Sequence, residues 1–198
     1  MTRSLSRWRL GQMAQMAVAP ACVGLSLFVF FFISPGELSL SNLRSLLGQM
    51  APLAIVAIGQ MVVIITRGFD LSVGSVAGLS AVAIALGVNW IGPAGVVLGP
   101  LAGVACGVVN GVVVGRLRIQ PLIATLGLLS IARGVALVIS GDNAVVIKGA
   151  NPLGFLGYGH VAGVPTAFVL TVVVALALTL VLAGTCGGRR LYMVGSNP

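Results

Sequence analysis

The run AGVVLGPLAGVACGVVNGVVVG, at residues 94–115, decides the fold class. It contains no charged side chain. As an α-helix it would be about 33 Å long, which is enough to cross the roughly 30 Å hydrocarbon core of a bilayer. Inside lipid the backbone must satisfy its own hydrogen bonds, and an α-helix does so within one segment. The run therefore predicts a transmembrane helix.

The composition of the whole chain agrees with this reading. Of its 198 residues, 58% are hydrophobic and 7% are charged, whereas soluble domains carry roughly 25% charged residues. The mean hydropathy is +1.14. The net charge of +8 is scattered between apolar runs rather than gathered into one basic patch, which argues against nucleic acid as a partner. We expect an all-α, polytopic helical bundle embedded in a lipid bilayer.

Apolar runs of spanning length recur along the chain. About six are expected, at residues 17–34, 46–66, 71–88, 94–115, 121–140 and 164–184. The sequence thus predicts a single membrane domain over residues 1–198. Its parts are a cytoplasmic N-terminus at 1–16, spans and loops over 17–184, and a cytoplasmic end at 185–198.

The basic residues predict the orientation. Arg3, Arg7 and Arg9 precede the first run, and no Ala-x-Ala cleavage site follows it, so this run is expected to be an uncleaved anchor with a cytoplasmic N-terminus. If the spans alternate, the external connections hold only Arg44 and Lys148. The cytoplasmic connections hold Arg67, Arg116, Arg118, Arg189 and Arg190. This excess inside follows the positive-inside rule.

Glycines recur at every fourth position of the run at 94–115. Such spacing aligns them on one helix face, where another helix can approach closely. We predict a helix-packing groove formed by Gly95, Gly99, Gly103, Gly107, Gly111 and Gly115.

Two polar residues need an explanation in such an apolar chain. Asp70 precedes the run at 71–88, where it is placed to cap the helix by accepting the amide of Ser72 or Val73. A role near a permeation path is the alternative, because acids in or at a membrane are costly. Arg133 lies about 18 Å along the run at 121–140. It either extends to the external interface or faces Asp70 or a polar cavity.

No metal site or catalytic residue is expected. Cys22, Cys106 and Cys186 lie far apart and form no CxxC pair, so we interpret them as small apolar residues. The single histidine, His160, falls in a turn-rich external connection at 141–163 and is expected to be solvated. That connection is long enough to face an extracytoplasmic partner.

Four sequence blocks, in order, resemble a known family. They are Gly59-Gln60, the run GFDLSVGS at 68–75, Asn110-Gly111, and PLIATLG at 121–127 followed by Arg133-Gly134. Together they are similar to the permease subunit of ribose- and xylose-type ABC sugar importers, within the superfamily of branched-chain amino acid and monosaccharide permeases. The resemblance extends from about Leu43 to the last residue, and the run at 68–75 is its most specific block.

The resemblance implies a multi-pass permease of the bacterial inner membrane. It implies a second permease subunit, identical or different, together with cytoplasmic ABC ATPase subunits and a periplasmic sugar-binding protein. The chain is then no enzyme and needs no cofactor. It also has no Gly-x-x-x-x-Gly-Lys-Ser/Thr pattern to hold a nucleotide. Candidates for lining the translocation path are Gln60, Asp70, Ser72, Asn110, Thr125 and Arg133.

The chain departs from the family at its end. It stops at Val194-Gly195-Ser196-Asn197-Pro198, where the segment that docks into the ATPase should begin. A fragment, a truncated product and one part of a split permease are all compatible with this.

Three further hypotheses compete with a sugar permease. The same architecture also suits a different cargo, namely a branched-chain amino acid, a nucleoside or an autoinducer-like sugar. A membrane subunit that does not transport is the second hypothesis. The third is a secondary transporter, which would need ion ligands within the membrane that only Asp70 offers.

Overall fold

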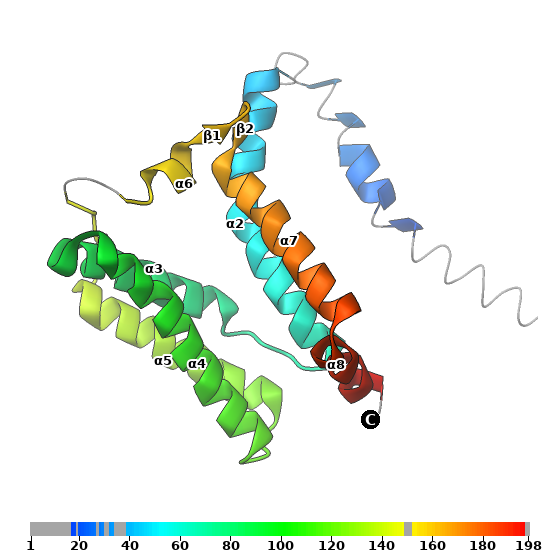
Figure 1. Ribbon diagram of the computed structural model, residues 1–198, viewed down its shortest axis with the longest axis vertical. Coiled ribbons are helices and arrows are strands. Elements are labelled where there is room, and N and C mark those ends of the chain that lie inside the picture. Colours follow the sequence, from blue (N-terminus) through cyan, green and yellow to red (C-terminus); the bar gives the residue numbers. More distant parts are fainter. Residues whose placement is uncertain are drawn as a thin grey trace, which may run out of the picture. The chain divides into compact units, whose positions relative to one another are not determined.

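The computed structural model describes residues 17–33 except 19, 27, 30 and 31, and then residues 39–148 and 152–196 (Figure 1). Its elements are mostly helical, as predicted. In order they are α2 (Leu40–Ile65), α3 (Val73–Ile91), the 3-10 helix η2 (Gly92–Val97), α4 (Leu98–Gly115), α5 (Pro121–Ser140), α6 (Gly154–Tyr158), β1 (His160–Val161), β2 (Val164–Pro165), α7 (Thr166–Gly184) and α8 (Cys186–Ser196).

Four of the described helical stretches are long and apolar enough to cross a membrane. They are Leu40–Ile65, Val73–Gly115, Pro121–Ser140 and Thr166–Gly184. The second is 43 residues long; it contains the predicted run 94–115 and all but the first two residues of the predicted run 71–88. The multi-pass helical membrane protein is thus confirmed. The predicted run at 17–34 lies partly outside the described residues, as does most of the N-terminus, so the count of six stays a prediction.

A tight turn folds α4 back onto α3. Gly92 adopts a positive φ of 71°, and η2 then leads the chain into α4. A Cβ atom on Gly95 would overlap the backbone of Gly87, and one on Gly99 would come within 2.5 Å of the Ile84 side chain. Glycine therefore allows the two helices to approach closely near the turn.

The far half of the glycine face on α4 is open in the described chain. A Cβ on Gly103 would lie 3.7 Å from the Ser80 hydroxyl, and one on Gly107, Gly111 or Gly115 would meet nothing within 4 Å. Packing along the whole face stays a prediction, and this half is the part of it that still lacks a neighbour here.

Helix α5 packs against both members of this hairpin, and the three helices lie side by side (Figure 1). Its bounds coincide with the predicted run, because Pro121 occupies its first turn and Gly141 ends it in the left-handed conformation. Its buried residues are Thr125, Leu128 and Ala132, which share one face.

A second group of helices is formed by α2, α7 and α8. The Thr171 hydroxyl of α7 donates to the Ala51 carbonyl of α2 over 3.2 Å, and both residues are buried. In α8, Gly188 lies against the backbone of Leu182, and Gly195 lies against the Ile65 carbonyl. The short helix α8 is therefore held at the ends of two spanning helices.

The predicted connection at 141–163 is more ordered than its turn-rich composition suggests. The side chain of Asn89 on α3 makes two bonds to this connection. Its Nδ2 donates to the Val146 carbonyl over 2.9 Å, and its Oδ1 accepts from the backbone N–H of Lys148 over 2.8 Å. Further on, α6 and the antiparallel pair of β1 and β2 lead into α7. His160 is exposed, and no role for it emerges.

We expect Gly95→Ala to destabilise the protein by about 1–3 kcal/mol, because the new methyl group would push η2 off the backbone of α3. The measurement is the free energy of unfolding in detergent micelles, followed by circular dichroism. Gly107→Ala is the matched control. It should be neutral or stabilising by up to about 1 kcal/mol, since its methyl group has room and alanine favours the helix. Equal losses in both variants would contradict the close approach at Gly95.

Candidate functional site

The chain leaves the helical conformation between α2 and α3, over residues 66–72. Helix α2 ends in a Schellman motif, in which the Gly68 amide donates to the Val63 carbonyl and the Arg67 amide to the Ile64 carbonyl, both over 2.9 Å. Arg67 takes the left-handed conformation with a φ of 56°. Residues 69–72 then continue without helix or strand until α3 begins at Val73.

Asp70 fixes the entry into α3. One of its carboxylate oxygens, Oδ1, accepts the Ser72 amide over 2.8 Å and the Ser72 hydroxyl over 2.6 Å. The predicted bond to the Ser72 amide is therefore confirmed. Asp70 lies two residues before the N-cap, Ser72, and forms an Asx turn there. Ser72 is only 1% exposed, so the hydroxyl bond forms inside the protein.

The same serine links this turn to α4. Asn110 donates from Nδ2 to the Ser72 hydroxyl over 3.4 Å. Asp70, Ser72 and Asn110 all line a cavity of about 150 Å³, which we name the Asp70 cavity; its other lining residues are Val73, Val76, Gly103, Cys106, Gly107 and Leu128. The structure therefore brings three of the six predicted path residues together.

The Asp70 cavity lies within the helical layer rather than beyond its end. At a helical rise of about 1.5 Å per residue, Asn110 lies about 7.5 Å before the end of α4 at Gly115. By the same rise, Leu128 lies about 10 Å after the start of α5 at Pro121. Asp70 is thus level with the interior of both helices. An acid at this depth marks a candidate functional site.

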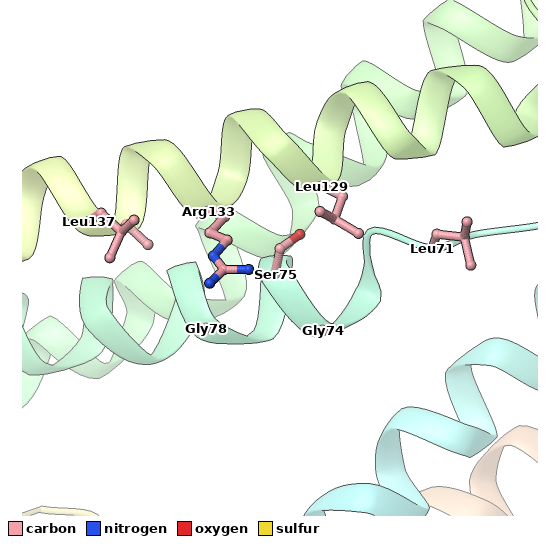
Figure 2. Close-up of a pocket in the computed structure, with 8 residues that line it drawn as sticks. Leu71, Gly74, Ser75, Gly78, Leu129, Arg133 and Leu137 are labelled. Carbon is pink, nitrogen blue, oxygen red and sulfur yellow. The ribbon is translucent and has the colours of Figure 1, made fainter. Parts of the chain in front are cut away.

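A second, larger cavity contains Arg133. It has a volume of about 380 Å³ and lies between α3 and α5; its lining residues are Leu71, Gly74, Ser75, Gly78, Leu129, Arg133, Ala136 and Leu137. We name it the Arg133 cavity. Figure 2 shows the Arg133 side chain extending from α5 toward α3, where Ser75 lies. Asp70 does not line this cavity, and Ser75 carries the one other polar side chain among its described lining residues, so the choice between the two sequence alternatives stays a prediction.

The remaining predicted residues lie elsewhere. Gln60 is on α2, and its Oε1 atom is buried with no hydrogen-bond partner among the residues that the structure describes. Thr125 is buried on α5 and donates to the Leu122 carbonyl over 3.4 Å. Neither residue lines the Asp70 cavity or the Arg133 cavity.

Sequence reasoning missed two lining residues. Cys106 was interpreted as a small apolar residue, although it precedes Asn110 by one helical turn and so shares its face. Ser75 was not among the predicted path residues, although it follows Asp70 and Ser72 in the same block. Helical spacing from Asn110 would have indicated Cys106, and helical spacing from Gly78 would have indicated Ser75.

Among the described residues, no group of histidine, cysteine or acidic side chains could hold a metal ion.

Comparison with known proteins decides the family. Residues 42–198 match the family model described as the permease component of the branched-chain amino acid transport system. The chain belongs to this permease family. It is 35% identical over 170 residues to the ribose import permease protein of Escherichia coli strain K12, covering 83% of this chain and 53% of that protein.

Two more relatives agree. The ribose import permease protein of Bacillus subtilis is 34% identical over 181 residues, covering 87% of this chain and 56% of the relative. The autoinducer 2 import system permease protein of Escherichia coli O9:H4 is 31% identical over 193 residues, covering 93% and 58%. The chain thus spans about half the length of these relatives. No solved structure matches it.

We expect Ser72→Ala to lower the free energy of unfolding by about 1–3 kcal/mol, because it removes the hydroxyl that donates to Asp70 and accepts from Asn110. The Asp70 carboxylate then keeps only the amide of residue 72, and the Asn110 amide loses this acceptor. The measurement is the free energy of unfolding in detergent micelles, followed by circular dichroism. Ser130→Ala is the matched control, since the Ser130 hydroxyl is exposed and bonds only to the Leu126 carbonyl of its own helix. A loss no larger than that of the control would show that Ser72 does not hold the cluster.

Proposed function

We propose that this chain is a transmembrane permease subunit of an ABC importer and forms the path for a monosaccharide such as ribose or xylose. A periplasmic binding protein delivers the sugar, and a separate ATPase supplies the energy. The observation that carries this proposal is the Asp70 cavity, where an acid, a serine and an asparagine converge inside the helical layer.

A membrane subunit without a path would not need this arrangement. Burying a carboxylate in lipid is expensive, and simple helix packing is served by glycines and apolar side chains. Here the polar groups of the turn before α3 and of α4 line one cavity together. The family membership and the names of the relatives, which import ribose, fructose or autoinducer 2, support the sugar importer over a purely structural subunit.

Membrane topology follows from the charges. We infer six spans, including one at 17–34, with the N-terminus in the cytoplasm of a bacterial cell. In this orientation the ends of α4 and α7 face the cytoplasm, where Arg116, Arg118, Arg189 and Arg190 lie. The same side would receive the ATPase subunits. The external side, with the connection at 141–163, would receive the binding protein, and a second permease subunit, identical or different, completes the pathway.

The alternative cargo that a specific observation favours is an autoinducer-like sugar. The autoinducer 2 import permease aligns over more of this chain than the ribose permeases do, although at lower identity. Both cargoes are small and rich in hydroxyl groups, so the same polar cavities suit either one.

Cells that carry the permease containing this chain together with a partner ATPase and a periplasmic sugar-binding protein should take up labelled ribose or xylose. Deleting the gene for this chain should abolish that uptake, while binding of the sugar to the isolated binding protein should persist. The measurement is accumulated label over time. Uptake confined to a branched-chain amino acid would contradict the sugar cargo, and unchanged sugar uptake after deletion would contradict the permease role.

A membrane-impermeant maleimide should distinguish the two sides of the membrane. Each test uses a variant with a single cysteine. Lys148→Cys, with the three native cysteines replaced, should react with the maleimide in intact spheroplasts, because we place this exposed residue outside. The native Cys186, also exposed, should react only after the membrane is permeabilised. Reaction of Cys186 in intact spheroplasts would reverse the proposed orientation.

A further inference from the structure

We propose that Arg133 and Ser75 form the subsite that binds the hydroxyl groups of a neutral sugar on its way through the permease. The inference rests on the proposed importer function and deepens it, because it names the atoms that hold the cargo. It depends on the hydrogen-bonding needs of Arg133, on the direction of its side chain and on the shape of the Arg133 cavity.

The guanidinium of Arg133 has more donors than its surroundings can satisfy. Among the described residues that line the Arg133 cavity, Arg133 and Ser75 alone carry polar side chains. The Ser75 hydroxyl donates its hydrogen to the Ser72 carbonyl over 2.7 Å, which leaves its oxygen as an acceptor. One hydroxyl oxygen cannot accept from all five N–H groups of an arginine. Arg133 is exposed in the described chain, so a bound molecule can reach these free donors from the open side of the cavity.

Arg133 does not point toward the nearer end of its helix. It lies about 10 Å before the end of α5 at Ser140, and side chains on a helix lean toward its N-terminus. Snorkelling to the surface beyond Ser140 would oppose this lean. Figure 2 instead shows the side chain directed at α3, beside Ser75. The charge thus lies part-way along the spanning helix on an exposed side chain, at a level where the hydrocarbon of a bilayer offers it no hydrogen-bond acceptor.

Two glycines keep the opposite wall clear. Gly74 and Gly78 are one helical turn apart on α3, and a Cβ on either would meet nothing within 4 Å. The space across from Arg133 therefore exists because no side chain fills it. Its volume of about 380 Å³ falls in the range of small-molecule sites, which run from about 300 to 1,000 Å³.

The lining suits a neutral polyhydroxylated ligand. The guanidinium can donate to two neighbouring hydroxyl oxygens, and a third hydroxyl can donate to the Ser75 oxygen. Leu129 and Leu137 offer apolar surface for the C–H face of a sugar ring. An anionic ligand would form a full ion pair at low dielectric and leave slowly, whereas a transport path needs binding weak enough for release.

Uptake by the complete importer, made from this chain with its ATPase and binding protein, tests the subsite. Arg133→Gln should lower ribose uptake at least about tenfold, because charge-assisted bonds to the sugar are lost. Arg133→Lys should recover part of it, since lysine keeps the charge but not the forked donors. Ser75→Ala should lower uptake by about threefold. ATP hydrolysis by each complex reports whether it has assembled.

A matched control comes from the same helix. Ser130→Ala removes a hydroxyl from α5 outside the Arg133 cavity and should transport as wild type does. If wild type transports and Arg133→Gln equals it, the subsite is wrong while the importer function stands. If the complete permease that contains this chain takes up no sugar, the importer function itself is wrong.

Thiol labelling tests the subsite without relying on uptake. In membranes holding the full complex, with other cysteines replaced, ribose at saturation should slow labelling of Ser75→Cys about tenfold and leave labelling of Ser130→Cys unchanged. Equal rates with and without ribose at Ser75→Cys would overturn the subsite. Stronger protection by a sugar acid than by ribose would overturn the neutral class of ligand.

Discussion

A backbone that leaves the helical conformation inside a bilayer must find its hydrogen-bond partners within the protein. Residues 66–72 meet this constraint in two ways. The Schellman motif closes α2 at Val63, and the Asp70 carboxylate accepts both the amide and the hydroxyl of Ser72 before α3 begins. An uninterrupted helix would present neither group to a cavity, so the polar site exists because the helix is broken here.

The close packing of α3 on α4 places the partner of this turn. Near Gly92 the two backbones nearly touch at Gly87 and Gly95, whereas about four turns away Asn110 reaches the Ser72 hydroxyl over 3.4 Å. The separation between the helices thus widens from backbone contact to a small cavity. Helix α5 closes its side through Leu128 and also carries Arg133. One three-helix unit therefore holds both polar cavities, joined by the bond from Ser75 to the Ser72 carbonyl.

Much of this architecture could be predicted from the sequence, because apolar length and charge placement are strong signals in membrane proteins. The bounds of α5 agree with the predicted run to the residue, since Pro121 and Gly141 mark its ends. The depth of Asp70 was not predictable, because hydropathy treats residues 66–72 as a connection between spans. The meeting of Arg133 with Ser75 also depends on how α3 and α5 are aligned, which no local pattern encodes.

If the space between α3, α4 and α5 belongs to a cargo path, water must reach it. Native Cys106 lines the Asp70 cavity and serves as a probe. With the other cysteines replaced, its reaction rate with a small charged methanethiosulfonate should far exceed that of Val108→Cys on the same helix, whose side chain is 59% exposed outside that cavity. A rate for Cys106 no higher than that for Val108→Cys would contradict a hydrated path at this site.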